Sequence, residues 1–250
     1  MIVLLHALAA PPAMWAAQRT ALGAAGHRVL TPALGGHGDR PHPDGPPSMD
    51  LLVDELVAEL DRADAGPVWL AGCSLGGYVA LALLRRAPER VRGLALLATR
   101  AEPDEPADRD RRLGFAAAMA DPAARATVVP AAAAALVGAT TRNRRPELAA
   151  AVRTAAEAVD PAAVAWCQRA AASRADGTAE LARFSGPGLA LVGEEDELVS
   201  RAEVERVAAA LPAGRLVVLP GVGHLSPLEA PDAVTAALTG WLARIPVVAP

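Results

Sequence analysis

The sequence has no lysine, few aromatic side chains and no strong excess of either charge. All 24 basic residues are arginine, and 28 acidic residues leave a formal net charge of -4. A weakly acidic protein lacks the basic surface that nucleic acids and anionic membranes attract. We therefore expect neither nucleic acid nor a membrane as its main partner.

Long hydrophobic runs are also missing, although 52% of the residues are hydrophobic. The apolar stretches, such as Met1–Leu5 and Ala131–Val137, are no longer than seven residues, whereas a membrane-spanning helix needs about 18 such residues. No basic segment precedes Ile2, which argues against a secretory signal peptide. The two cysteines, Cys73 and Cys167, lie far apart and in no metal-binding spacing. This pattern predicts no disulfide framework and a reducing, cytoplasmic location.

Six short apolar runs, often flanked by glycine or proline, are candidate strands. Strands buried on both faces of a parallel sheet have this nearly continuous apolar character. The runs are Ile2–His6, Arg28–Thr31, Val68–Ala71, Arg92–Ala98, Gly188–Val192 and Leu216–Leu219. Helical patterns separate most of them, and the alternation predicts an α/β fold with a mostly parallel sheet of about six strands.

Helical spacing is clearest in three segments. Apolar residues recur at i, i+3, i+4 and i+7, which places them on one face of a helix. The first set includes Val53, Leu56 and Leu60, and the second includes Val204 and Leu211. The third set includes Val234, Leu238, Trp241 and Ile245. Ser200 and Glu203 form a predicted capping box before the second of these helices.

Residues 104–183 break the alternation, because they contain no convincing strand. The segment is rich in alanine, of which the chain has 61, and alanine favours helix while adding little packing bulk. We expect four or five short helices there, with boundaries at Pro106, Pro122, Pro130, Pro146 and Pro161. The predicted organisation is a core of residues 1–103 and 184–250 and a lightly packed, more mobile helical insertion at 104–183.

The strongest local signal is Gly72-Cys73-Ser74-Leu75-Gly76, which follows a predicted strand and opens the helix Leu75–Arg86. Such a G-x-S-x-G turn presents the serine hydroxyl at the carboxyl end of the sheet, beside N–H groups at a helix N-terminus. Glycines on both sides allow neighbouring elements to approach closely. Taken alone, the pentapeptide is equally consistent with an ordinary glycine-rich turn.

Two further groups follow later strands. A serine needs a base to accept its proton, and the base needs an orienting carboxylate. Asp196 lies in the Gly193-Glu194-Glu195-Asp196 segment after the fifth predicted strand, and His224 follows Gly223 after the sixth. The chain order Ser74, Asp196, His224 is the order of α/β-hydrolases.

With these motifs in one order, the chain resembles the α/β-hydrolase superfamily over essentially its whole length. Leu4-Leu5-His6-Ala7-Leu8 resembles the oxyanion-loop region, and Gly36-His37-Gly38 resembles the turn after the next strand. The insertion lies where the family places its lid, or cap. Within this family the chain looks most like small esterases, enol-lactonases and related cofactor-free hydrolases. The family usually has His-Gly where this chain has His6-Ala7, so the loop is expected to follow a slightly different path.

The resemblance implies a role for each residue. Ser74 attacks an acyl carbonyl, His224 accepts and later returns the proton, and Asp196 orients the imidazole. The backbone N–H groups of Leu8 and Leu75 are the expected oxyanion-hole donors. No metal ion or organic cofactor is required.

Competing assignments remain open for several residues. Glu195 is the alternative acid beside Asp196, and Cys73 is a much weaker candidate nucleophile that we expect to point into the core. His6 is expected to brace the oxyanion loop. Trp166, Met119 and Phe115 are candidate lining residues of a substrate pocket under the lid, although each also suits core packing.

The sequence thus predicts a serine hydrolase that cleaves a small carboxylic ester or lactone. The same triad also suits a thioesterase, a carbon–carbon hydrolase, a haloperoxidase-like enzyme or a biosynthetic cyclase, because substrate choice depends on the insertion. A ligand sensor with little turnover and an inactive relative are the non-enzymatic alternatives.

Overall fold

The computed structural model describes residues 1–8, 10–38 and 40–244, in which six parallel strands form one sheet. The strands are β1 (Ile2–Leu5), β2 (Val29–Leu30), β3 (Val68–Cys73), β4 (Val91–Leu97), β5 (Gly188–Gly193) and β6 (Gly214–Leu219). Their spatial order is β2-β1-β3-β4-β5-β6. Each strand overlaps its predicted run, so the predicted fold class and strand number are confirmed.

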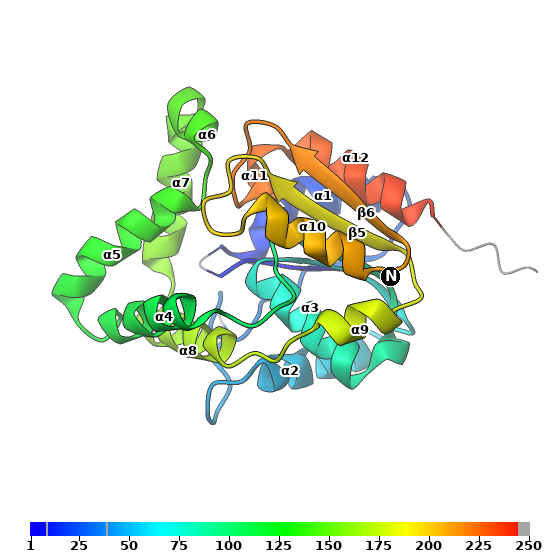
Figure 1. Cartoon of the computed structure of the whole chain (residues 1–250), viewed down its shortest axis with the longest axis horizontal. Coiled ribbons are helices and arrows are strands. Elements are labelled where there is room, and N and C mark those ends of the chain that lie inside the picture. The colour runs from blue at the N-terminus through cyan, green and yellow to red at the C-terminus, as the bar shows by residue number, and fades with distance from the viewer. Residues whose placement is uncertain (9, 39, 245–250) are drawn as a thin grey trace, which may run out of the picture.

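Helices cover both faces of this sheet (Figure 1). The helices on one face are α2 (Met49–Arg62), α3 (Leu75–Arg86) and α10 (Arg201–Ala210). The helices on the other face are α1 (Ala16–Ala24) and α12 (Pro231–Leu242). Successive side chains of a strand point to opposite faces, and accordingly Leu5 packs in the first layer and Leu4 in the second.

The starts and ends of these helices agree with the local sequence signals. Helix α3 has its predicted bounds, and the capping box is present at the start of α10, where the Ser200 hydroxyl accepts a hydrogen bond from the N–H of Glu203. The α12 pattern extends in sequence to Ile245, which lies outside the described residues, as does the rest of the predicted core segment after residue 244. The remaining short elements are η1 (Pro12–Trp15), η2 (Pro88–Arg90) and α11 (Ser226–Glu229).

The segment 104–183 is helical, as predicted, but it contains six helices instead of four or five. They are α4 (Pro106–Ala118), α5 (Pro122–Ala135), α6 (Ala139–Arg144), α7 (Pro146–Ala158), α8 (Pro161–Ala172) and α9 (Thr178–Arg183). Helices α4 to α8 extend to one side of the sheet, whereas α9 lies against α3 (Figure 1). That this insertion acts as a lid stays a prediction.

Prolines mark most of the boundaries in the insertion. A proline opens α4, α5, α7 and α8, where its missing N–H costs no helical hydrogen bond. Pro130 is the exception, because it lies inside α5, so the predicted boundary there is wrong. A proline removes one helical hydrogen bond, and the alanine-rich sequence on its C-terminal side favours continuation of the helix. No helix within the described ranges is both long and apolar enough to cross a membrane.

Candidate active site

Ser74 lies at the sharp turn between β3 and α3. Its backbone has φ +52° and ψ −113°, its N–H donates to Leu97 O over 2.9 Å, and its carbonyl accepts from the Gly77 N–H. A Cβ atom on Gly72 would lie 2.3 Å from the Gly76 carbonyl oxygen, and one on Gly76 would lie 2.3 Å from a backbone oxygen of β1. The turn therefore requires both glycines of the G-x-S-x-G sequence.

His224 and Asp196 form a buried pair on the loops after β6 and β5. The Nδ1 of His224 lies 3.0 and 2.9 Å from the two carboxylate oxygens of Asp196, and the two side chains are 2% and 0% exposed. Oδ1 of Asp196 also accepts the N–H groups of Leu198 (2.8 Å) and Val199 (3.0 Å). With a proton on Nδ1, the neutral ring carries its lone pair on Nε2, the atom that a general base uses.

The carboxylate of this pair stays ionised. Burial alone would raise the pKa of Asp196, but the attraction of His224 and the hydrogen bonds from His224, Val199 and Leu198 hold that pKa below its usual value. An ionised Asp196 accepts the hydrogen bond of the Nδ1–H group and so fixes the ring tautomer of His224.

Glu195, the alternative acid, points away from His224. Its carboxylate accepts hydrogen bonds from the N–H and the hydroxyl of Thr140 in α6, both at 2.7 Å. These hydrogen bonds lower the pKa of Glu195. Asp196 is therefore the residue of the two that contacts the histidine.

A cavity of about 270 Å³ brings several predicted residues together, and we call it the Ser74 cavity. Ser74, His224, Leu8, Leu75 and Phe115 all line it. Among the described residues, no protein acceptor pairs with the N–H of Leu8 or Leu75. Both donors are thus available to a ligand oxygen.

The other two predicted pocket residues lie elsewhere. Met119 is buried in a small cluster with Ala116 and Val164. Trp166 packs in the core, where its indole N–H donates to Gly45 O over 3.2 Å and its ring stacks on His42. Helix α8 turns Trp166 away from the Ser74 cavity and presents Val164, Cys167 and Gln168 to it instead. Met119, at the end of α4, does not line that cavity either.

The cysteine beside Ser74 is a poor alternative nucleophile. Cys73 is fully buried, its Sγ donates to the carbonyl oxygen of His224 over 3.8 Å, and burial raises the pKa of its thiol well above the usual range. Burial likewise raises the pKa of Cys167 to about 12. A thiol acts as a nucleophile only as thiolate, and both thiols stay protonated.

His6 joins the loop after β1 to the neighbouring loop. Its Nε2 accepts the N–H of Leu34 over 2.9 Å, and its Nδ1 lies 2.8 Å from Ala7 O. Burial, with a smaller effect of the nearby His37, lowers the pKa of His6 to about 3. The neutral ring therefore braces the segment that ends at Leu8.

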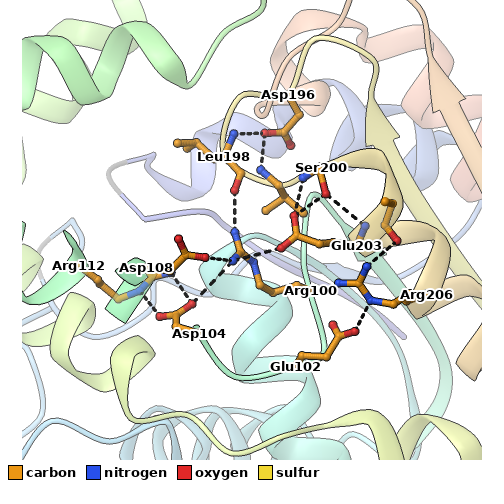
Figure 2. Close-up of polar contacts among 12 residues, drawn as sticks. Arg100, Glu102, Asp104, Asp108, Arg112, Asp196, Leu198, Ser200, Glu203 and Arg206 are labelled. Carbon is orange, nitrogen blue, oxygen red and sulfur yellow. Dashed lines mark hydrogen bonds and ion pairs between the residues drawn. The ribbon is translucent and has the colours of Figure 1, made fainter. Parts of the chain in front are cut away.

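Arg100, which follows β4, links the Asp196 loop to the insertion (Figure 2). Its guanidinium donates to Leu198 O over 2.7 Å and pairs with Asp108 of α4 at 3.0 Å and with Glu203 of α10 at 3.2 Å. Because the N–H of Leu198 donates to Asp196, one chain of polar contacts runs from that carboxylate to α4.

Asp104 joins the two ends of the insertion. Its side chain is fully buried and pairs with Arg112 at 2.8 Å and with Arg174 at 2.7 Å. Burial alone would raise the pKa of Asp104, but the two arginines hold it below its usual value. The sequence analysis missed these residues, because charged side chains in an arginine-rich chain carry no motif and Arg174 is distant in sequence.

Glu229 connects the His224 loop to α6, and the sequence analysis missed it as well. Its buried Oε2 accepts hydrogen bonds from the N–H of Gly138 (2.8 Å), the N–H of Gly223 (3.0 Å) and the hydroxyl of Thr141 (2.7 Å). Gly223 directly precedes His224. One carboxylate therefore holds both the histidine loop and the start of α6.

Comparison with known proteins agrees with this architecture. Residues 2–237 match the Alpha/beta hydrolase family, and the chain belongs to that family. A thermophilic esterase from Thermogutta terrifontis superimposes with a TM-score of 0.91 and 32% identity, over 97% of this chain and 89% of that protein. The enol-lactonase from Burkholderia xenovorans LB400 superimposes with a TM-score of 0.86 and 27% identity, over 97% and 91%.

The similarity to some curated sequences is more local. The pimeloyl-[acyl-carrier protein] methyl ester esterase of Aromatoleum aromaticum is 44% identical over 98 residues, which are 39% of this chain and 36% of that enzyme. The chain thus spans only about a third of the length of this curated relative in the match.

Proposed function

We propose that this protein is a serine hydrolase that cleaves a small carboxylic ester or lactone, with Ser74 as nucleophile, His224 as general base and Asp196 as the orienting acid. The observation that carries the proposal is the buried His224–Asp196 pair, whose histidine lines the same cavity as Ser74. The esterase and enol-lactonase among the similar structures support the same reaction class.

Each step of the proposed reaction uses groups of this chain. The Ser74 hydroxyl attacks the acyl carbon while His224 Nε2 accepts its proton, and the N–H groups of Leu8 and Leu75 donate to the oxyanion. The tetrahedral intermediate collapses, His224 gives its proton to the leaving alkoxide, and an acyl-enzyme remains. Water, deprotonated by His224, then attacks the acyl carbon and releases the acid and free Ser74.

The cavity supports a small substrate. Its volume of about 270 Å³ lies below the roughly 300–1,000 Å³ of cavities that bind drug-sized ligands. Much of its wall is apolar, and the apolar lining residues include Leu8, Leu75, Phe115, Val129, Leu136 and Val164. A short acyl group with a small alcohol, or a lactone ring, suits this space.

A panel of p-nitrophenyl esters, lactones and thioesters tests the proposal. We expect the wild-type protein to hydrolyse the short oxygen esters and Ser74→Ala to lower kcat by about four to six orders of magnitude, as in other triads. Cys73→Ala is the matched control at the adjacent position and should retain most activity. A Ser74→Ala variant with wild-type kcat contradicts the proposal, and a preference for thioesters alone would redirect the substrate class.

A further inference from the structure

A second cavity lies beyond Tyr78, which forms one wall of the Ser74 cavity. This second cavity, which we call the rear cavity, has a volume of about 390 Å³ and lies between α2, α3 and residues 173–177. Within the described chain, Tyr78 is the one residue that lines both cavities. Its side chain therefore stands at the boundary between them.

The two cavities follow each other along the same two helical segments. On α3, Leu75 lines the Ser74 cavity and Leu81 lines the rear cavity, with Tyr78 between them at helical spacing. On the other side, Ala171 of α8 lines the first cavity and Arg174 lines the second. A path along α3 from Ser74 thus meets the ring of Tyr78 before it reaches the rear cavity.

The ring of Tyr78 is held in place by two arginines. Its side chain is buried, and the guanidinium groups of Arg174 and Arg112 lie 4.3 and 5.9 Å from the ring centroid. Both arginines pair with the buried Asp104, which fixes them over the aromatic face. No hydrogen bond of the Tyr78 hydroxyl is found among the described residues, so the contacts of the two arginines with its ring position this side chain between the cavities.

We propose that Tyr78 determines the acyl-chain length that the enzyme accepts, by closing the Ser74 cavity against the rear cavity. This inference rests on the proposed function. His224 must reach the leaving group to protonate it, so the leaving group occupies the His224 side of the cavity and the acyl chain extends away from it, along α3. The partition at Tyr78 then restricts the natural substrates to short acyl groups.

Replacing the ring should join the two cavities. We expect Tyr78→Ala to raise the ratio of kcat/KM for p-nitrophenyl octanoate over p-nitrophenyl butyrate by about tenfold or more, because single methylenes that find or lose space already change specificity by that much. The gain should arise mainly in KM for the octanoate ester. Tyr78→Leu, which keeps more apolar bulk, provides a second variant with a smaller shift if the alanine variant is unstable.

Two controls separate the partition from other effects. Tyr78→Phe keeps the ring and removes only a hydroxyl without a protein partner, so its chain-length profile should equal that of the wild type. Leu81→Ala enlarges the rear cavity one turn further along α3 and leaves the partition intact, so it should not admit octanoate. A chain-length shift in Leu81→Ala equal to that in Tyr78→Ala would overturn the proposal.

Failure of this inference is distinguishable from failure of the proposed function. If the wild type and folded Tyr78→Ala and Tyr78→Leu variants all hydrolyse the butyrate ester with the same chain-length profile, the enzyme is an esterase and Tyr78 does not set chain length. If the wild type hydrolyses no ester and Ser74 resists both butyl and octyl phosphonates, the proposed function fails and the role of Tyr78 fails with it. If the chain-length profile shifts in Tyr78→Ala and stays that of the wild type in Tyr78→Phe, the result supports both the proposed function and the role of Tyr78.

Discussion

Ser74 is held in a backbone conformation that few residues other than glycine adopt. Its φ of +52° with ψ of −113° costs free energy of order 1–3 kcal/mol, and the surrounding turn compensates for that cost. The sequence predicted the sharp turn at this residue, because only glycine at positions 72 and 76 permits the close contacts with Gly76 O and with β1. It left the acid open between Asp196 and Glu195, since neighbouring carboxylates in one loop differ only in the direction of their side chains.

The acid assignment gives a prediction at this scale. Asp196→Asn should lower kcat by about 10⁴, because the amide cannot stabilise the imidazolium and favours the wrong tautomer. Glu195→Gln should keep kcat within a few fold, since its carboxylate binds Thr140 and not His224. Steady-state kinetics with a short ester measures both. A severe loss in Glu195→Gln beside a mild one in Asp196→Asn would reverse the assignment.

At the scale of helices and loops, an ion pair and hydrogen bonds join the insertion to the loops that carry Asp196 and His224 of the proposed triad. Arg100 joins α4 to Leu198 beside Asp196, and Glu229 joins α6 to Gly223 beside His224. The sequence predicted the helical character of the insertion from its alanine content. It did not predict these bonds, because each joins residues from separate parts of the chain through ordinary charged side chains.

Glu229 provides the test of this coupling. Glu229→Ala should lower the free energy of unfolding by about 2–6 kcal/mol, because it leaves the buried N–H groups of Gly138 and Gly223 without an acceptor at about 1–3 kcal/mol each. It should also lower kcat, since Gly223 positions the His224 loop. Urea unfolding and ester kinetics measure the two effects.

Glu197, in the loop after β5, is the matched control, because it also contacts α6. Its ion pair with Arg142 joins two partly exposed side chains, and such pairs contribute about 0–1 kcal/mol. Glu197→Ala should therefore leave stability and kcat nearly unchanged. If it costs as much as Glu229→Ala, the buried carboxylate has no special role.

For the whole molecule, the sequence predicted the sheet better than the cavities. Apolar runs between glycines and prolines located all six strands, because burial on both faces imposes that pattern. The residues that line the cavity were harder to predict, since helical periodicity shows which side of α4 or α8 is buried but not which neighbour covers each residue. The sequence therefore could not distinguish Phe115, which lines the Ser74 cavity, from Trp166 and Met119, which pack elsewhere.

Two buried histidines make the free energy of unfolding of the whole molecule depend on pH. Burial lowers the pKa of both His6 and His37, that of His6 to about 3 from 6.5. Below pH 6.5 the unfolded chain binds protons that the folded protein does not, so the free energy of unfolding falls as the pH decreases. The expected slope is about 1.4 kcal/mol per pH unit for each neutral histidine, and for His6 it persists down to about pH 3.

Urea unfolding between pH 7 and about 5.5 measures this slope above the range where most carboxylates titrate. His6→Gln removes one titrating group and should flatten the pH dependence by about one proton, although it also lowers stability at pH 7 by disturbing the bond to Leu34. His27→Gln, at an exposed position, is the control and should keep the wild-type slope. An unchanged slope in His6→Gln would contradict the buried neutral state.

The central claim is that Ser74 is the nucleophile, and covalent labelling tests it most directly. The purified protein is treated with a serine-directed alkyl phosphonate, digested and analysed by mass spectrometry, with Asp196→Asn and Ser74→Ala in parallel. We predict one stoichiometric adduct on Ser74 of the wild type, a much slower reaction in Asp196→Asn and none in Ser74→Ala. An adduct on Cys73, or labelling that persists in Ser74→Ala, would contradict the account.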